Sequence, residues 1–336
     1  MTADLAVFFL GGTIAMAGHR DGVVQRLTGS DVMSAVPQLA DLDVTVQTHD
    51  FRAMPSACLS FEDILELVAA ADSAVTGGAT GVVVVQGTDT IEETAYLIDL
   101  VWPHDAPVVV TGAMRNPTLA GADGPANLLA ALRVAGSDRF AGLGCLVALN
   151  DQVHAARYVR KAHSSNPASF TSPDSGPLGQ LVEGEPVLLS RPPGRLVLPR
   201  LSSAAEARVA LVTVALDDDG GLLAGVADKY GGLVIAGFGV GHVPATLADP
   251  LAELAERIPV VLASRTGAGA VFAHTYGFAG SESDLRSRGL IGAGLLDPYK
   301  ARILLRLLLA NGADRTQIGA AFAAAGGLGP AEPGPS

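Results

Sequence analysis

Basic residues and cysteines are both scarce in this sequence of 336 residues. It has 22 lysines and arginines against 34 aspartates and glutamates, so its net charge is −12. A surface of that sign repels nucleic-acid phosphates and anionic membranes. Residues 157–161, Arg-Tyr-Val-Arg-Lys, come nearest to a basic stripe, but they are short and isolated. We therefore exclude nucleic acid as a partner.

Several other features are missing as well. Two cysteines, Cys58 and Cys145, are too few for a disulfide framework and fit a reducing cytoplasm. No apolar stretch approaches the roughly 20 residues of a membrane span, so we expect no membrane association. The first apolar run leads straight into Gly11-Gly12 and has no basic region before it, which predicts a strand and not a signal peptide. The seven histidines are scattered, with no pair at ligand spacing beside a carboxylate, so we expect no metal site.

Strand-like runs alternate with helical patterns, which predicts βαβ units and a parallel sheet. We expect strands at residues 5–10, 82–85, 108–111 and 146–149, then at 209–215, 233–237 and 260–263. Ser60 and Asp63 form a capping-box-like helix start, and Asp297-Pro298 forms another good start. Residues 183–207 are turn-rich and are expected to connect two domains. The first domain then covers residues 1–182 and the second residues 208–325, while residues 326–336 form a disordered tail.

Two short threonine motifs follow apolar runs directly. Gly11-Gly12-Thr13-Ile14-Ala15 follows the first expected strand, and Gln86-Gly87-Thr88-Asp89-Thr90 follows the second. If these strands are parallel neighbours, both threonines lie at the carboxyl edge of the sheet, where open α/β sheets hold their ligands. A hydroxyl beside an acidic residue points to nucleophilic attack on a carbonyl group.

Each motif also has a purely local interpretation. Two glycines serve any tight turn after a strand, and Thr13 could simply hydrogen-bond that turn. Asp89 or Thr90 could cap a helix, with Glu92 or Glu93 as the partner at the third position. Such a helix start would still present amide N–H groups to a developing oxyanion.

A polar stretch, residues 150–166, follows the expected strand at residues 146–149. Within it, Lys161 could act as a base if its pKa were lowered, or as a charge partner for Asp89. A solvated loop lysine is the simple alternative. Another segment, residues 237–242 (Gly-Phe-Gly-Val-Gly-His), lacks the spacing of a dinucleotide site and is expected to be a glycine-rich turn. A nicotinamide-dependent oxidoreductase is thus unsupported, and we expect no cofactor.

Five segments in order, from about residue 5 to residue 312, resemble the bacterial L-asparaginase family within the asparaginase/glutaminase superfamily. They are Gly11-Gly12-Thr13-Ile14-Ala15; residues 87–95, Gly-Thr-Asp-Thr-Ile-Glu-Glu-Thr-Ala; residues 111–127, from Thr-Gly-Ala-Met-Arg to Gly-Ala-Asp-Gly-Pro-Ala-Asn; Lys161 with Ser172-Pro173 and residues 176–179, Gly-Pro-Leu-Gly; and residues 297–305, Asp-Pro-Tyr-Lys-Ala-Arg-Ile-Leu-Leu. The resemblance implies an α/β fold: a larger N-terminal flavodoxin-like domain with a mostly parallel sheet, and a smaller C-terminal α/β domain.

The resemblance also implies roles for individual residues. Thr13 matches the family's first catalytic threonine, the usual nucleophile. Thr88, Asp89 and Lys161 match its second catalytic group, in which lysine and aspartate activate or orient a threonine. Asp89 would also bind the α-amino group of the substrate.

Further positions match substrate contacts of the family. Ser56 aligns with the serine that holds the α-carboxylate, although Thr48 and His49 lie in a comparable polar segment. Ala113 matches the position whose backbone faces the substrate amide. His242 stands where the family has an asparagine that reaches a neighbouring subunit's site.

His242 is one departure from the family pattern, and a missing tyrosine is the second. The family carries a tyrosine in the mobile loop after its first threonine, but residues 16–30 here contain none. Either a distant tyrosine replaces it or Thr13 is poorly activated, and we favour poor activation. Glu282 is the nearest match for a glutamate that the family contributes across the dimer, although a solvated loop residue is the simpler interpretation.

The expected activity is therefore that of an L-asparagine amidohydrolase, which releases ammonia and L-aspartate through a threonine acyl-enzyme. The family resemblance implies a homotetramer built as a dimer of dimers. The low cysteine content favours the cytoplasm, and we expect no cofactor or metal. A glutaminase or broader amidohydrolase is an alternative, because one methylene is discriminated by only about 1–3 kcal/mol. A non-catalytic small-molecule-binding relative is the other.

Overall fold

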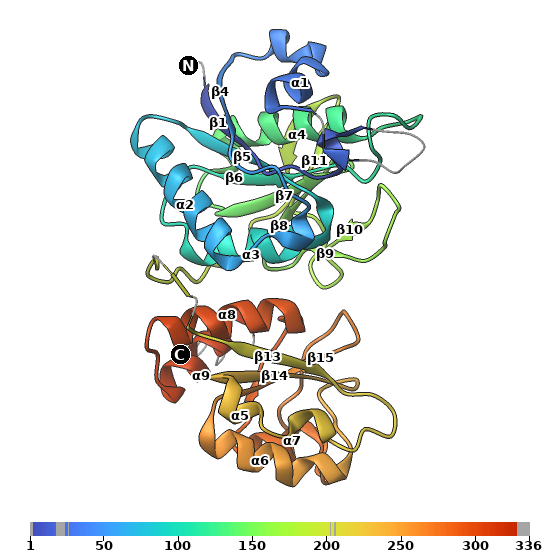
Figure 1. Ribbon diagram of the computed structural model, residues 1–336, viewed down its shortest axis with the longest axis vertical. Helices are drawn as coiled ribbons and strands as arrows, with labels where there is room; N and C mark the ends of the chain where they lie inside the picture. Colours follow the sequence, from blue (N-terminus) through green and yellow to red (C-terminus); the bar gives the residue numbers. More distant parts are fainter. Residues whose placement is uncertain (1–2, 18–23, 26, 202, 205, 328–336) are drawn as a thin grey trace, which may run out of the picture. The chain divides into compact units, whose positions relative to one another are not determined.

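The computed structural model describes residues 3–17, 24–25, 27–201, 203–204 and 206–327 (Figure 1). The chain divides into two compact units, residues 1–202 and residues 203–336. Each unit is an α/β layer structure with its own sheet, which confirms the predicted fold class. None of the helices in the described ranges is long and apolar enough to cross a bilayer.

The first unit is built on an eight-stranded sheet in the order β12-β11-β8-β7-β6-β5-β1-β4. The strands are β1 (Ala3–Phe9), β4 (Val44–Asp50), β5 (Gly81–Val85), β6 (Val108–Thr111), β7 (Cys145–Leu149), β8 (Gln152–Ala155), β11 (Gly179–Val182) and β12 (Glu185–Leu188). β4, β1, β5, β6 and β7 are parallel, in the 2-1-3-4-5 order of flavodoxin-like sheets. β8, β11 and β12 extend the sheet with antiparallel pairing.

Helices cover both faces of this sheet: α1 (Gly29–Ser34) and α4 (Gly124–Ala135) lie on one face, and α2 (Phe61–Thr76) and α3 (Ile91–Val101) on the other (Figure 1). The central strands β5, β6 and β7 are buried along their whole length. Burial on both faces explains why they read as continuous apolar runs without alternation. The predicted capping box of α2 is confirmed: the Ser60 hydroxyl accepts the N–H of Asp63, and the Asp63 carboxylate accepts the N–H of Ser60.

The strand order reverses between β1 and β5. From β1 the chain crosses to β4 on one side, and every later strand of the sheet lies on the other side. At such a switch point the loops leaving the two neighbouring strands diverge, which opens a crevice at the carboxyl edge. The two threonine motifs are the loops that leave β1 and β5.

The first unit reaches beyond the predicted limit at Val182. Residues 185–188 form β12, the edge strand of the large sheet, through antiparallel pairing with β11. The stretch that we expected to connect the domains therefore begins inside a hairpin, and its turn residues Glu183 and Gly184 both have positive φ. The turn-rich composition correctly indicated a turn at this point, but it gave no signal for the short strand that follows.

The second unit holds a four-stranded parallel sheet, β13-β14-β15-β16. Its strands are β13 (Val209–Thr213), β14 (Gly232–Gly237), β15 (Val260–Ser264) and β16 (Ile291–Gly292), and its helices are α5 (Val226–Lys229), α6 (Ala248–Arg257), α7 (Glu282–Ser287), α8 (Pro298–Ala310) and α9 (Arg315–Ala325). Asp297 caps α8 as predicted, because its carboxylate accepts the N–H groups of Tyr299 and Lys300. From residue 328 onward, the tail expected to be disordered lies outside the described residues.

Candidate active site

The loops after β1 and β5 touch through their glycines. A Cβ on Gly12 would lie 2.2 Å from the Gly87 backbone nitrogen, and Gly12 has a φ of 93°. Only a residue without a side chain fits such a contact and such a backbone conformation. The contact brings together the segments in which Thr13 and Thr88 are the next residues.

Lys161 joins the second threonine to its aspartate. Its Nζ donates to the Thr88 Oγ1 at 3.0 Å and to the Asp89 Oδ1 at 2.8 Å. The lysine side chain is only 13 % exposed, whereas that of Asp89 is 67 % exposed. The ammonium therefore reaches a buried hydroxyl, while the carboxylate stays open to a ligand. The predicted partnership of Lys161 with Asp89 is present, and Lys161 is no solvated loop residue.

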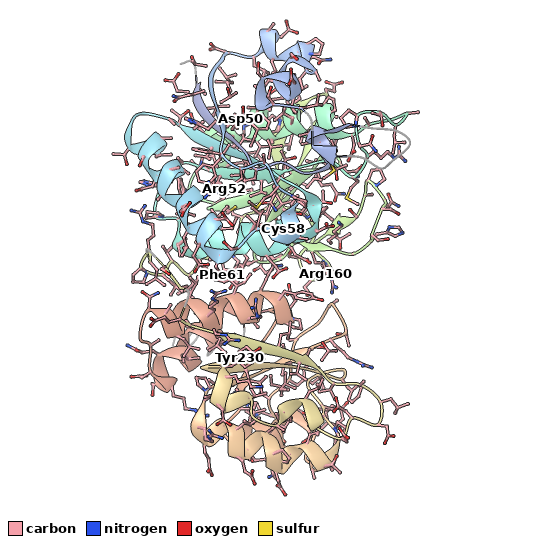
Figure 2. All side chains as sticks on the ribbon, in the orientation of Figure 1. Asp50, Arg52, Cys58, Phe61, Arg160 and Tyr230 are labelled. Carbon is pink, nitrogen blue, oxygen red and sulfur yellow. The ribbon has the colours of Figure 1, made fainter. Side chains whose placement is uncertain are left out.

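The lysine comes from a small separate ribbon. β9 (Arg160–Lys161) and β10 (Phe170–Thr171) pair antiparallel outside the main sheet, and Arg160 is labelled in Figure 2. The backbone N–H of Lys161 donates to the Glu92 Oε2 at 2.8 Å. The Glu92 carboxylate therefore holds another strand, and the N–H of Asp89, which a capping partner would accept, donates to the Ser56 hydroxyl instead. Thr90, the residue before α3, makes no side-chain capping bond either.

Ser56 lies against the Thr88 loop. It begins a short 3₁₀ turn, Ser56–Cys58, whose last residue is labelled in Figure 2. The Ser56 Oγ accepts the N–H of Asp89 at 3.2 Å, and the Ser56 carbonyl accepts the Thr90 hydroxyl. Because the Ser56 hydroxyl accepts here, it keeps its own proton for another acceptor.

Thr48 and His49, the alternatives to Ser56, lie in the C-terminal half of edge strand β4. Thr48 pairs with Val7, and His49 pairs with Phe8 in the sheet register. The His49 ring stacks on the Phe8 ring at a centroid distance of 4.7 Å and an interplanar angle of 13°. Of the three residues, Ser56 is the one that the fold brings to Asp89.

The backbone around Ala113 is fixed by a buried polar network. The Asn127 side-chain amide donates to the Gly112 carbonyl at 2.9 Å and to the Asp123 carboxylate at 3.1 Å. The Asp123 carboxylate in turn accepts the N–H of Met114 at 3.0 Å. Ala113 is thus held on both sides and is fully buried. Sequence reasoning assigned no role to Asp123 or Asn127, although both lie in the segment that carries the family resemblance.

Thr13 opens a 3₁₀ turn, Thr13–Ala15, that leads into residues 16–30, the segment that matches the family's mobile loop. The described part of this segment includes a ribbon of β2 (Met16–Ala17) and β3 (Val24–Gln25), while residues 18–23 and 26 lie outside the described residues. Two tyrosines of the first unit bear on the question of what replaces the family's loop tyrosine. Tyr96 is buried within α3, and the ring of Tyr158 lies 4.5 Å beneath the Arg157 guanidinium.

His242 belongs to the second unit, where it pairs with a buried acid. Its Nε2 lies 3.2 Å from the Glu282 Oε2, and the rings of Tyr276 and Phe278 pack edge-on at 4.9 Å. The Glu282 side chain is 0 % exposed, so the interpretation as a solvated loop residue is wrong. Burial is the largest influence and opposes its ionisation, but the bonds from the N–H groups of Tyr276, Thr275 and Glu282 and from His242 together hold the pKa of this carboxyl below its usual value. The Glu282 carboxylate thus holds the loop of Thr275 and Tyr276 in place through their two backbone hydrogen bonds.

The glycine-rich segment after β14 forms a tight turn. Gly239 and Gly241 both have positive φ, and the N–H groups of Gly241 and His242 return to the Phe238 carbonyl. Among the described residues, no group of three or more His, Cys, Asp or Glu side chains is placed to hold a metal ion.

A doubly wound sheet that carries hydroxyl, carboxylate and ammonium groups at its switch point has the equipment of an enzyme that attacks a carbonyl carbon. Comparison with known families identifies the family within this class of enzymes. The family model "Asparaginase, N-terminal" matches residues 4–194, and the model "Glutaminase/Asparaginase C-terminal domain" matches residues 208–322. The chain belongs to the asparaginase family and is an amidohydrolase, as its sequence motifs predicted.

Individual relatives agree over almost the whole chain. The L-asparaginase of Bacillus licheniformis is 34 % identical over 93 % of this chain and 97 % of its own length. The probable L-asparaginase of Deinococcus radiodurans is 36 % identical over 95 % of this chain and 96 % of its own length. The crystal structure of a probable cytoplasmic L-asparaginase from Campylobacter jejuni is similar with a TM-score of 0.86 and 32 % identity, covering 96 % of this chain and 99 % of that one.

Proposed function

We propose that this protein hydrolyses the side-chain amide of L-asparagine and releases ammonia and L-aspartate. The observation that carries the proposal is the contact of the Lys161 ammonium with both Thr88 and Asp89, next to the loop that bears Thr13. The names of the relatives support L-asparagine as the substrate, since those from B. licheniformis and Escherichia coli are called L-asparaginases.

The reaction runs as a double displacement. The Thr13 Oγ attacks the amide carbon, its proton passes to the leaving nitrogen, and ammonia departs to leave an ester on the enzyme. Water then attacks the ester carbon, and L-aspartate leaves as the Thr13 hydroxyl is restored. Thr88, Asp89 and Lys161 serve as the second catalytic group, in which the lysine orients the Thr88 hydroxyl and exchanges protons with it. Backbone N–H groups near Thr88 stabilise the oxyanion, and losing one such donor costs about 3 kcal/mol in comparable sites.

The substrate is held by its two charged ends. The exposed carboxylate of Asp89 suits an α-ammonium group, and the hydroxyl of Ser56 can donate to the α-carboxylate. The rigid peptide around Ala113 faces the side-chain amide. These three residues occupy three different loops at one edge of the sheet, so they can grip a small amino acid from several sides.

Ammonia release from L-asparagine, D-asparagine and L-glutamine by the purified protein tests the proposal. We expect the highest kcat/KM with L-asparagine. Lys161→Met serves as the inactive control in the same assay, so that contaminating amidases are excluded. The proposed function would be refuted if ammonia release were equal in the wild type and in Lys161→Met, or absent from both.

Glutamine is the second candidate substrate, because the C-terminal family model is named for glutaminase as well as asparaginase. The two amides differ by one methylene, which a pocket distinguishes by only about 1–3 kcal/mol. A kcat/KM ratio for L-asparagine over L-glutamine below one would make the protein a glutaminase with the same catalytic group.

We propose further that the active protein is a homotetramer, a dimer of dimers, in which His242 contributes to a neighbouring subunit's site. Three aromatic side chains of the second unit, Phe272, Tyr276 and Phe278, are between 42 % and 51 % exposed, and two of them flank His242. Exposed aromatic clusters of this kind are typical of association surfaces. Light scattering should give four times the mass of one chain, and Phe278→Ser should lower that mass. A monomer with full activity would contradict the proposal.

We also propose that the protein acts in the cytoplasm. Both cysteines, the exposed Cys58 and the buried Cys145, are free thiols, which suits a reducing compartment. Relatives differ in this respect, since the Haemophilus influenzae relative is named a probable periplasmic L-asparaginase. Fractionation of the native cells decides the point, and recovery from an extracytoplasmic fraction would overturn it.

A further inference from the structure

Lys161 is held at both ends by one helix start. Its ammonium contacts Thr88 and Asp89, and its backbone N–H donates to the carboxylate of Glu92 at 2.8 Å. All three acceptors come from five consecutive residues, 88–92, whereas Lys161 is 69 residues farther along the chain than Glu92. The same short segment therefore supplies the hydroxyl that the lysine ammonium contacts and the carboxylate that binds the lysine backbone N–H.

The bond to the Lys161 backbone matters because it ties a short ribbon directly to the first turn of α3. β9 has only two residues and lies outside the main sheet, paired to an equally short β10. Directly after β10, the Ser172 hydroxyl lies 2.9 Å from the Nδ1 of His154. A lysine reaches its target through a long flexible chain, so a shift of its backbone moves the ammonium away from Thr88.

The carboxylate of Glu92 is well suited to this task. It is charged, so its hydrogen bond to an amide is stronger than a bond between neutral groups. It also lies in the first turn of α3, where a negative charge is stabilised by the helix dipole. The helix therefore holds the carboxylate, and the carboxylate holds the ribbon.

We propose that Glu92 is the positioning residue for Lys161: its hydrogen bond to the Lys161 backbone sets the distance between the lysine ammonium and the Thr88 hydroxyl. The inference rests on the proposed function only for its kinetic consequence. The bond itself exists whatever the protein hydrolyses.

Two variants separate the hydrogen bond from the charge. Glu92→Ala removes both, and misplacement of a catalytic group by about 1 Å lowers the rate about 100-fold. We expect kcat with L-asparagine to fall by about 10- to 100-fold. KM should change less than about 3-fold, because the bond from the Asp89 N–H to the Ser56 hydroxyl does not depend on Lys161. Glu92→Gln retains an oxygen of the same reach, so we expect its kcat to stay within about 5-fold of wild type.

Glu93→Ala is the matched control. Glu93 lies in the same first turn of α3 and shares the helix-dipole effect, but Glu92 is the residue that accepts the Lys161 N–H. We expect Glu93→Ala to keep kcat near that of wild type. A loss as large as in Glu92→Ala would assign the effect to the charge of the helix start. An equal loss in Glu92→Gln and Glu92→Ala would likewise overturn a positioning role.

Amide hydrogen exchange of Lys161, followed by NMR, tests the bond without any turnover. Protection should be lost in Glu92→Ala and kept in Glu92→Gln. If the wild type releases no ammonia from L-asparagine, the proposed function fails while this measurement still decides on Glu92. If Glu92→Ala does not fold, wild-type kcat together with wild-type Lys161 protection in Glu92→Gln supports the role, and a loss of protection in that variant refutes it.

Discussion

Gly12 and Gly87 meet backbone to backbone at the point where the two catalytic loops leave the sheet. Gly12 adopts a φ of 93°, and a Cβ there would come within 2.2 Å of the Gly87 nitrogen. Gly87 is also closely packed, since its own Cβ would lie 2.7 Å from the Ser56 Oγ. The loops that carry Thr13, Thr88 and Ser56 therefore meet at two glycines, and they can lie this close only because these glycines have no side chains.

Gly12→Ala should separate the two loops and abolish activity. The added methyl group meets backbone atoms, which cannot move aside as a flexible side chain can, so we expect a loss of stability larger than the strain of a positive φ alone. Gly78→Ala is the matched control: Gly78 also has a positive φ, but nothing lies within 4 Å of its Cβ. Its cost should be about 1–3 kcal/mol with kcat/KM unchanged. Urea unfolding and turnover of both variants check the prediction, and an active Gly12→Ala enzyme would contradict it.

Thr88→Ala and Lys161→Met should each abolish turnover without loss of fold or assembly. Proton transfer by a positioned group contributes about 10²- to 10⁴-fold, so kcat should fall by at least 100-fold. The exposed Lys229 offers a control, because Lys229→Met removes the same charge far from Thr88 in the chain and should leave kcat unchanged. If either site variant kept a substantial part of kcat, the catalytic assignment would be wrong. Loss of assembly instead would indicate a structural role.

Acylation at Thr13 should be slow compared with relatives that carry the loop tyrosine. Residues 16–30 contain no tyrosine, and Tyr96 and Tyr158 have other surroundings. Rapid quenching followed by peptide mass spectrometry would locate the ester and time its formation. If an ester forms on Thr13 at a rate typical of such relatives, the prediction of poor activation is wrong. An ester on Thr88 would move the nucleophile and leave Thr13 as an orienting group.

Asp99 should make the protein less sensitive to mild acid. Burial raises the pKa of this carboxyl to about 6, against the bonds from the Cys145 N–H and the Arg195 guanidinium. Between pH 3.8 and about 6 the folded state then binds more protons than the unfolded state, so this contribution is fully present below pH 3.8 and is lost as pH rises through 6. Its size is about 3 kcal/mol. Asp99→Asn should therefore lose more stability than wild type when urea unfolding is compared at pH 6 and pH 4.

His154 should act with the opposite sign. Burial lowers its pKa from 6.5 to about 4, so the unfolded state binds more protons between these values. The contribution of His154 is present above pH 6.5 and is lost as pH falls through 4, again by about 3 kcal/mol. His154→Asn, which can still reach the Ser172 hydroxyl, should flatten the loss of stability below pH 6.5. The slope against pH is the test, because any packing defect shifts the curve without tilting it. An unchanged slope would refute the assignment.

Local signals in the sequence predicted local structure well. The capping box of Ser60 and Asp63 and the cap at Asp297 formed as expected, because each involves residues two or three positions apart. The uninterrupted apolar runs predicted the central strands for a similar reason, since burial on both faces leaves no room for alternation. The short strand β12 was missed, because its residues 185–188, Glu-Pro-Val-Leu, carry no such signal.

By itself, the sequence determined the family, the α/β class and the two threonine loops, because motifs and hydrophobic runs are properties of neighbouring residues. Only the tertiary structure decided which polar groups act together. Lys161 reaches Thr88 across 73 residues, and Glu92, a candidate partner of a helix cap, holds a strand. Glu282 is buried, although a solvated loop residue was the simpler interpretation. Hydrogen bonds between distant segments depend on how sheet and helices pack, and no local pattern of residues encodes that geometry.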